Sequence, residues 1–303
     1  MRIILCGKNA TAVSCLEFLI KQGDQVWAIG TGGDDGGEGW QPSFKSAAAR
    51  LGAAFDQPAK INDDAFVSRL EAFKPEILIS IQYDQIVREN LFRKLGAPCL
   101  NLHFSLLPRH RGVAPIAWAV CSGDREAGAT LHHMVESIDA GDVITQRAVS
   151  IRDDDTARDV YDKVSEAAFE LFKDAYPFTS DLLQQRLPQD RTKASYHRKG
   201  DFDFSNRRID WNQPIADLLP WIRTMIFPPL QLPETLLNGR RLQVVAVGHK
   251  MGDAKNHKPG SVVRVSSRGI DVAACDGTIR LTEVIDPEKP GTASAALMKE
   301  IPA

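Results

Sequence analysis

Short apolar runs alternate with helix-like segments over the first hundred of the 303 residues. The apolar runs are 2–6, 25–30, 77–81 and 99–104. The segments with the apolar spacing of a helix are 13–20, 44–51, 63–73 and 88–95. Strands that alternate with helices predict an α/β fold, with a Rossmann-like, mostly parallel sheet and helices on both faces. In such a sheet, ligands bind beyond the carboxyl ends of the strands.

The pattern changes after a polar and basic stretch, residues 187–208, which also contains proline and glycine. Beyond it, and mainly from Arg241 onward, four short strand-like runs are separated by turns. Short strands spaced in this way predict a small β-rich domain that resembles an OB-like barrel. The domains predicted are an α/β domain at 1–186, a linker at 187–208 and a C-terminal β-rich domain at 209–303.

Composition argues against several classes of protein. The formal net charge is −2, so no excess of positive charge points to nucleic acid or an anionic membrane. No apolar run approaches the roughly 20 residues of a membrane-spanning helix, and the N-terminus becomes polar too early for a signal peptide. Five cysteines without paired spacing suit a reducing cytoplasm rather than a disulfide framework or zinc knuckle. His132 and His133 are adjacent and would face opposite sides of a strand, so we expect no metal site.

Two polar side chains interrupt the end of the run 99–104. Asn101 and His103 are two residues apart, which places both on one face of a strand. An asparagine amide donates to an oxygen that becomes negative, and a histidine accepts and returns a proton, so the pair suits attack of an amine on a carbonyl. Asp139, in a glycine-containing loop after a neighbouring strand, is the candidate to orient the imidazole or accept the proton. Taken alone, these residues equally fit a structural histidine and ordinary turn chemistry.

The stretch NLHFSLLPRHRG, which begins at Asn101, and the loop IDAGD around Asp139 resemble the folate-dependent formyltransferase family. That family carries Asn-x-His-x-Ser-Leu-Leu-Pro, then Arg-Gly, then an Asp-x-Gly loop, with Asn, His and Asp as its catalytic trio. The resemblance therefore implies that Asn101, His103 and Asp139 are catalytic. It also implies an enzyme that uses 10-formyltetrahydrofolate as formyl donor and a primary amine as acceptor.

The resemblance further implies roles for the trio and a place for the donor. Asn101 and a protonated His103 are expected to stabilise the oxyanion, while Asp139 holds His103 and helps to take the proton from the amine. The donor is expected to lie against the segment after the strand 77–81, the turn after His103 and the loop before Asp139. The residues implied are Tyr83, Gln85, Ile86, Ser105, Leu106, Leu107, Pro108, Val135, Glu136, Ser137 and Ile138.

The acceptor could be a nucleotide-linked amino sugar, the methionine on initiator tRNA, or a small amine such as hydroxyornithine. Relatives that modify tRNA carry a basic insertion after the second strand. The corresponding stretch here, TGGDDGGEGWQPSFK, has three acidic residues and one lysine, and we expect a flexible surface loop that does not bind phosphate. Residues 113–118 and the stretch LHHMVESIDAGDVITQ are also similar to bacterial sugar N-formyltransferases. These features favour an amino-sugar nucleotide, although basic residues between Arg191 and Arg208 offer some support for tRNA.

Two further classes are considered. A folate-binding or sugar-nucleotide-binding module without activity would be expected to have lost part of the trio, which is intact. A hydrolase that releases formate usually carries a regulatory domain before the core, whereas the first strand here begins at Arg2. We therefore expect a cytoplasmic enzyme that acts on a small-molecule acceptor, with no nucleic-acid or membrane partner. Analogy with sugar formyltransferases suggests a homodimer.

Overall fold

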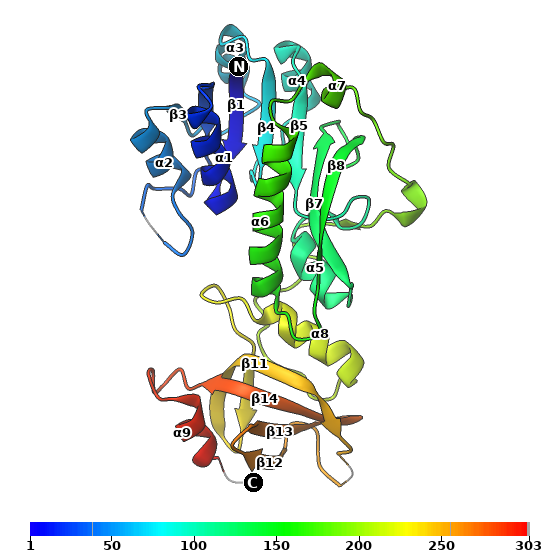
Figure 1. Cartoon of the computed structure of the whole chain (residues 1–303). Helices are drawn as coiled ribbons and strands as arrows, with labels where there is room; N and C mark the ends of the chain where they lie inside the picture. Colours follow the sequence, from blue (N-terminus) through cyan, green and yellow to red (C-terminus); the bar gives the residue numbers. More distant parts are fainter. Residues whose placement is uncertain (38, 255, 302–303) are drawn as a thin grey trace. The chain divides into compact units, whose positions relative to one another are not determined.

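The computed structural model describes residues 1–37, 39–254 and 256–301, and it divides into two compact units (Figure 1). The first unit comprises Met1–Pro115, Ala127–Val149 and Lys163–Arg198. The second comprises Ile116–Glu126, Ser150–Asp162 and the residues from Lys199 onward. Because each unit combines segments that are distant in sequence, the domain boundaries after residues 186 and 208 stay a prediction.

A seven-stranded sheet forms the centre of the first unit, in the order β3-β2-β1-β4-β5-β7-β8. Its strands are β1 (Arg2–Gly7), β2 (Gln25–Ile29), β3 (Ala54–Asp56), β4 (Ile77–Ile81), β5 (Cys99–His103), β7 (Glu126–His133) and β8 (Val143–Ser150). The strands from β3 to β5 in this order pair in parallel, whereas β7 runs antiparallel to β5. The mostly parallel sheet predicted from the sequence is confirmed.

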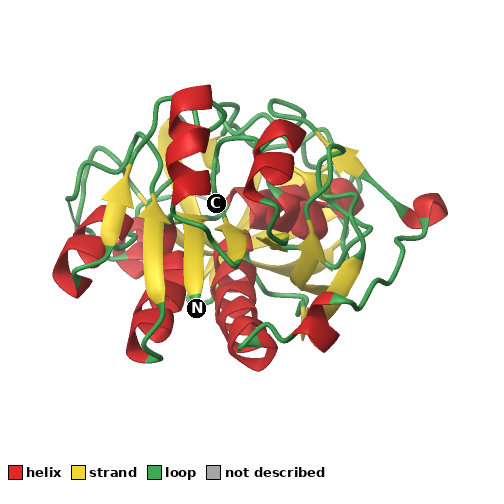
Figure 2. Ribbon diagram, turned by 90° about the horizontal axis from the view of Figure 1, so that it is seen from above, coloured by secondary structure: helices red, strands yellow, loops and turns green. Residues whose placement is uncertain are grey.

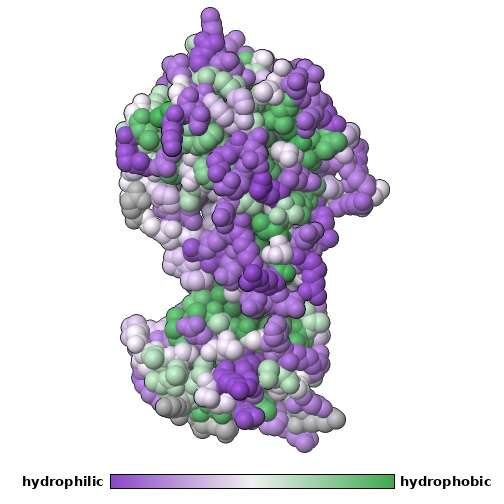
Figure 3. All heavy atoms as spheres, in the orientation of Figure 1, coloured by the Kyte–Doolittle hydropathy of each residue, from purple (hydrophilic) through white to green (hydrophobic). Residues whose placement is uncertain are grey.

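Helices cover both faces of this sheet (Figure 2). The α-helices of the first unit are α1 (Asn9–Lys21), α2 (Phe44–Leu51), α3 (Asp64–Ala72), α4 (Glu89–Leu95), the part of α6 (Ala157–Ala175) from Lys163 onward, and α7 (Ser180–Leu183). Helix α5 (Pro115–Cys121) belongs to the second unit from Ile116 onward. On one face, Leu70 of α3 and Leu91 of α4 share a buried core with Leu78 of β4. On the other face, the ring of Phe18 in α1 meets the edge of Phe172 in α6, with centroids 6.3 Å apart. Hydrophilic side chains predominate on the visible surface of this unit, as expected for an enclosed apolar sheet (Figure 3).

A five-stranded antiparallel sheet forms the second unit, in the order β10-β11-β14-β13-β12. Its strands are β10 (Glu234–Leu237), β11 (Arg240–Gly252), β12 (Val262–Ser266), β13 (Gly269–Ala274) and β14 (Gly277–Ile285). Helices α8 (Ile215–Met225) and α9 (Ser294–Lys299) contribute Ile222 and Met298 to its core. The predicted C-terminal β-rich domain is confirmed. The sequence predicts four of the five strands. It misses β10, because the alternation of only four residues cannot be distinguished from a turn.

The predicted linker contains regular structure. Residues 187–198, which we call the strap, belong to the first unit and include the 3-10 helix η1 (Arg191–Lys193) and the strand β9 (Tyr196–His197). β9 pairs in parallel with β6 (Arg111–Gly112), which follows the turn after β5. The strap therefore lies beside the residues that the sequence marks as functional. None of the helices in the described part of the chain is both long and apolar enough to cross a membrane.

The glycine-rich stretch between β2 and α2 is more ordered than expected around Asp34. One oxygen of this carboxylate accepts a hydrogen bond from Ser43 Oγ (2.6 Å), and the other accepts one from Lys45 N (2.9 Å) at the start of α2. Partial burial would raise the pKa of Asp34, but these hydrogen bonds lower it. One acidic side chain of the stretch therefore holds α2 in place. Glu38, another of them, lies outside the described residues.

Candidate active site

Asn101, His103 and Asp139 meet at the carboxyl edge of the first sheet. β5 carries Asn101 and His103, and the loop after β7 carries Asp139. Asn101 Nδ2 donates to Asp139 Oδ1 at 3.2 Å, and His103 Nδ1 lies 3.6 Å from Asp139 Oδ2. The structure therefore brings the three side chains together on one carboxylate, where the alternation of a strand predicts the first two to face the same way.

The carboxylate of Asp139 is held by its own backbone and by a neighbouring amide. Asp139 has a φ of +52°, a left-handed conformation that aspartate tolerates better than most residues. Its Oδ2 accepts a hydrogen bond from Gly112 N at 2.8 Å. Burial would raise the pKa of Asp139, but His103, His132 and the Gly112 N–H together lower it. Asp139 is therefore an anion at neutral pH.

The protonation of His103 follows from its two neighbours. The side chain is almost enclosed, with 8% of the residue exposed, and Nε2 lies 2.9 Å from the carbonyl oxygen of His110. Because a carbonyl oxygen only accepts, Nε2 carries the hydrogen and Nδ1 is the basic nitrogen, on the side of Asp139. Burial lowers the pKa of His103, although the Asp139 carboxylate and the His110 carbonyl raise it. The net effect lowers the pKa of His103, which favours the neutral imidazole at rest, and the protonated His103 expected during the reaction stays a prediction.

His132 is a fourth member of the cluster that the sequence interpretation misses. It lies opposite Asn101 in the β5–β7 pairing, and its Nε2 is 3.2 Å from Asn101 Nδ2 and 3.5 Å from Asp139 Oδ1. Its Nδ1 faces the carbonyl of His133 at 2.9 Å, so Nδ1 carries the hydrogen and Nε2 accepts from Asn101. From the sequence, we consider His132 only as a possible metal ligand. Strand alternation nevertheless places one of the two adjacent histidines on the face of the sheet that carries Asn101.

Both amide hydrogens of Asn101 have acceptors in this arrangement. One donates to Asp139 Oδ1 and the other to His132 Nε2, and both distances are 3.2 Å. These are long hydrogen bonds, so exchanging one of them for a substrate oxygen is a small rearrangement. An oxyanion role for Asn101 requires that exchange.

Gly112 approaches the strap too closely to carry a side chain. Its φ is +89°, and a Cβ built on it would overlap the carbonyl oxygen of His197. The same residue donates its N–H to Asp139. A glycine at this position therefore serves both the backbone turn and the carboxylate.

Replacing Gly112 with alanine is expected to lower the free energy of unfolding by about 2–5 kcal/mol. About 1–2 kcal/mol comes from the left-handed backbone and about 1–3 from the overlap with His197. Urea denaturation measures the loss. The matched control is Gly96→Ala, because Gly96 has a φ of +61° with nothing within 4 Å, so only the backbone cost applies. Equal losses in the two variants would show that the close approach is unimportant.

Some of the residues implied for the donor are engaged in the protein's own hydrogen bonds. Ser105 is buried, and its Oγ donates to the carbonyl of Arg109 at 2.7 Å. Gln85 donates from Nε2 to the carbonyl of Pro58 at 2.8 Å, and its Oε1 accepts from Ile61 N at 2.8 Å. Leu107 is buried as well. These side chains hold the loops around the site in place, and the contacts with the donor that the resemblance implies for these residues stay a prediction.

Other residues of the same set are open to solvent. Ile86 is 58% exposed and Val135 is 44% exposed, and Glu136 and Ser137 beside Val135 are exposed too. Tyr83 is partly buried against the core, and its hydroxyl has no hydrogen-bond partner. Ile86 and Val135 are thus exposed apolar side chains in the segments that follow β4 and β7, and their contact with the donor stays a prediction. Leu106, Pro108 and Ile138 are partly buried. No group of three or more metal-binding side chains occurs among the described residues.

An amide, an imidazole and a carboxylate at the carboxyl edge of an α/β sheet define an enzyme-like site. Residues 27–176 match the family model described as formyl transferase, and residues 203–301 match its C-terminal domain. A methionyl-tRNA formyltransferase of Ruminiclostridium cellulolyticum is 31% identical, over 94% of this chain and 91% of its own. One from Methylococcus capsulatus is 32% identical, over 95% of this chain and 93% of its own. The chain belongs to the formyl transferase family, as the sequence predicts.

Two solved structures share the fold. The sugar 3N-formyl transferase WlaRD, in the presence of dTDP and 5-N-formyl-THF, has a TM-score of 0.72 and 23% identity, and the match covers 95% of this chain and 98% of that one. The N-formyltransferase from Helicobacter canadensis, in complex with folinic acid and dTDP-3-aminofucose, has a TM-score of 0.73 and 23% identity, with 93% and 99% covered. At this identity the likeness shows the common fold.

Proposed function

We propose that this enzyme transfers a formyl group from 10-formyltetrahydrofolate to a primary amine, with Asn101, His103 and Asp139 as the catalytic residues. The supporting observation is that an amide and a basic imidazole nitrogen both face one buried carboxylate, in a chain of the formyl transferase family. When bound, the folate supplies a formyl carbon on a nitrogen that leaves. The exposed Ile86 and Val135 offer it apolar contacts, and the loop Val135–Ile138 offers backbone groups.

In this mechanism, His103 transfers the proton, while Asp139 and Asn101 stabilise the charges that develop. Neutral His103 accepts the proton of the attacking amine at Nδ1 and later returns it to the leaving nitrogen. Asp139 stays ionised beside Nδ1 and stabilises the imidazolium that forms. Asn101 donates one N–H to the carbonyl oxygen as it becomes negative, in place of one of its long hydrogen bonds. No side chain needs to form a covalent intermediate in this sequence.

The acceptor we propose is the amine of a nucleotide-linked amino sugar. The stretch from Thr31 to Lys45 lacks the basic residues that phosphate contacts on tRNA require, since it has three acidic residues and a single lysine. One of the acidic side chains, Asp34, is used to hold α2, so its hydrogen-bonding oxygens are occupied. The charge of this stretch still opposes a polyanion.

A second candidate acceptor is methionyl initiator tRNA. The specific observation in its favour is that the relatives at 31% and 32% identity are methionyl-tRNA formyltransferases, matched over nearly their whole length. The basic residues between Arg191 and Arg208 would then meet the tRNA backbone. Some of these are balanced within the protein, as Lys193 lies 3.6 Å from Asp190.

Release of tetrahydrofolate from 10-formyltetrahydrofolate distinguishes the two acceptors. We expect release with 4-amino-sugar nucleotides and none with methionyl initiator tRNA, each offered separately at equal amine concentration. Hydroxyornithine in a third reaction tests a small free amine. Release only with charged tRNA would contradict the sugar assignment. The basic residues between Arg191 and Arg208 would then be assigned to acceptor binding.

A further inference from the structure

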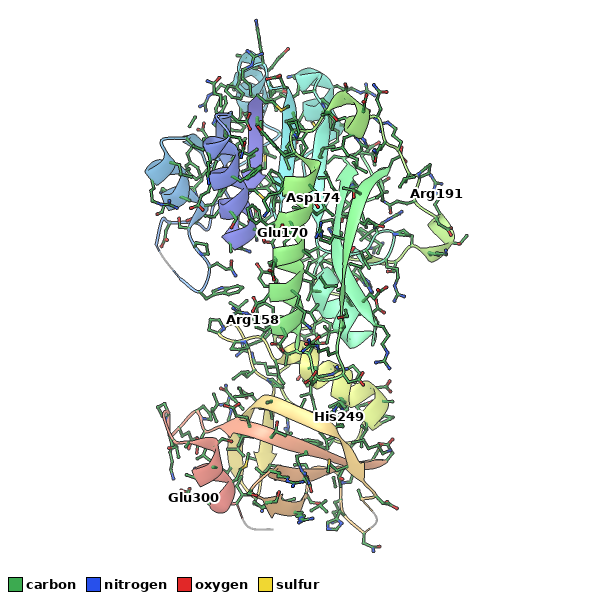
Figure 4. All side chains as sticks on the ribbon, viewed as in Figure 1. Arg158, Glu170, Asp174, Arg191, His249 and Glu300 are labelled. Carbon is green, nitrogen blue, oxygen red and sulfur yellow. The ribbon has the colours of Figure 1, made fainter. Side chains whose placement is uncertain are left out.

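The strap is attached to the turn that follows β5. Arg111 N donates to the carbonyl of Ser195 and Val113 N donates to the carbonyl of His197, both at 3.0 Å. Figure 4 shows the strap along the outer edge of the first unit, where it carries Arg191. These backbone bonds join two segments that lie more than eighty residues apart in the sequence.

Gln189 of the strap bridges the turn after β5 and the Asp139 loop. Its Nε2 donates to the carbonyl of Asp139 at 2.8 Å and to the carbonyl of Gly141 at 2.6 Å. Its Oε1 accepts from Arg111 Nε at 3.0 Å and from Arg111 Nη2 at 2.7 Å. One side-chain amide therefore uses its donors on the loop of the catalytic carboxylate and its acceptor on the residue beside Gly112.

The strap also holds the backbone that fixes the tautomer of His103. His110 N donates to Ser195 Oγ at 2.8 Å, and the His110 ring stacks on His197 with centroids 5.3 Å apart. His110 has a φ of +55°, a left-handed conformation that is uncommon for residues other than glycine, although histidine adopts it more often than most. Its carbonyl oxygen is the partner of His103 Nε2. The strap thus contacts the supports of both His103 and Asp139.

We propose that the strap is part of the catalytic apparatus and that Gln189 is a positioning residue, which sets the Asp139 carboxylate against His103. This inference rests on the proposed function of that pair. Gln189 donates its hydrogen bonds to backbone carbonyls and accepts others from Arg111. It acts through the backbone of Asp139, whose left-handed turn it supports at the carbonyl, and through Arg111, which precedes the N–H donor of Gly112.

The physical basis is the accuracy that proton transfer demands. Without the Gln189 amide, the carbonyls of Asp139 and Gly141 lose a shared donor, and the loop is free to relax. A misplacement of about 1 Å in a catalytic group costs on the order of 100-fold in rate. Gln189→Ala is therefore expected to lower kcat by about 10- to 100-fold, with little change in KM for 10-formyltetrahydrofolate.

The experiment compares Gln189→Ala, Gln189→Glu and Gln184→Ala in the full chain. Gln189→Glu keeps an acceptor for Arg111 but points oxygen at two carbonyls, so we expect it to lose at least as much kcat as Gln189→Ala. Gln184 is an exposed glutamine on the segment just before the strap, and its variant should match the wild type. Activity is measured with the acceptor that the wild-type enzyme uses, well below the midpoint of thermal unfolding of each variant.

A substrate-free measurement separates positioning from general support. NMR titration of the His103 imidazole should give a lower pKa in Gln189→Ala than in the wild type, because the Asp139 carboxylate that raises it is less well placed. A lower unfolding midpoint with unchanged kcat and an unchanged His103 titration would overturn the inference. A wild-type enzyme that forms no formylated product while Gln189→Ala still shifts the titration would instead contradict the proposed function.

Discussion

Replacing His103 with alanine is expected to lower kcat by about 10²- to 10⁴-fold, the range that a general acid–base residue contributes. Nδ1 of this imidazole is the basic nitrogen beside Asp139, and its removal leaves the attacking amine without a proton acceptor. Steady-state release of tetrahydrofolate measures the loss, together with a thermal unfolding curve for the purified variant.

The control for His103 is His249→Ala. His249 is an exposed histidine on β11 of the second unit, and its loss should leave kcat unchanged (Figure 4). In the wild type, the acid limb of the kcat/KM profile should lie below the ordinary imidazole pKa of 6.5, because burial lowers the pKa of His103. A folded His103→Ala variant with near-normal turnover would remove His103 from the mechanism.

Replacing Asp139 with asparagine is expected to lower kcat by about 10²- to 10⁴-fold. Asparagine tolerates the φ of +52°, so the loop keeps its shape while the negative charge beside His103 is lost. The imidazolium that forms during proton transfer then lacks its counter-charge. Single-turnover formation of tetrahydrofolate measures the chemical step. The matched control is Asp142→Asn, because that carboxylate lies three residues further on and faces Arg186 at 3.8 Å.

The same substitution has an effect on stability that depends on pH. The pKa of Asp139 is lower in the folded protein than in an unfolded chain, so its ionised form stabilises the fold above the unfolded pKa. That contribution is lost as the pH falls through the lowered value. The difference in free energy of unfolding between the wild type and Asp139→Asn should therefore narrow on acidification.

Comparable turnover in Asp139→Asn and Asp142→Asn would contradict the assignment of Asp139.

The catalytic role of Asn101, His103 and Asp139 stays a prediction that rests on the family resemblance. The sequence by itself determined the α/β class of the first unit, the β-rich second unit and the shared face of Asn101 and His103 on β5. These features are local: period-two alternation sets the faces of β5, and a short motif marks where the strand ends. The same alternation places the two adjacent histidines of β7 on opposite faces of the sheet, and the pairing of β7 with β5 puts His132 opposite Asn101.

Only the tertiary structure decided what completes the site. The sequence predicts a polar linker at residues 187–198, because their side chains show no hydrophobic periodicity. Their structural role comes instead from hydrogen bonds to segments that are distant in the sequence. Gln189 meets the carbonyl of Asp139 across 50 residues, and His197 meets His110 across 87. The tautomer of His103 likewise depends on the His110 carbonyl, and the lowering of its pKa depends on burial. Contacts between segments so far apart leave no local pattern in a single sequence, because chain folding alone brings their partners together.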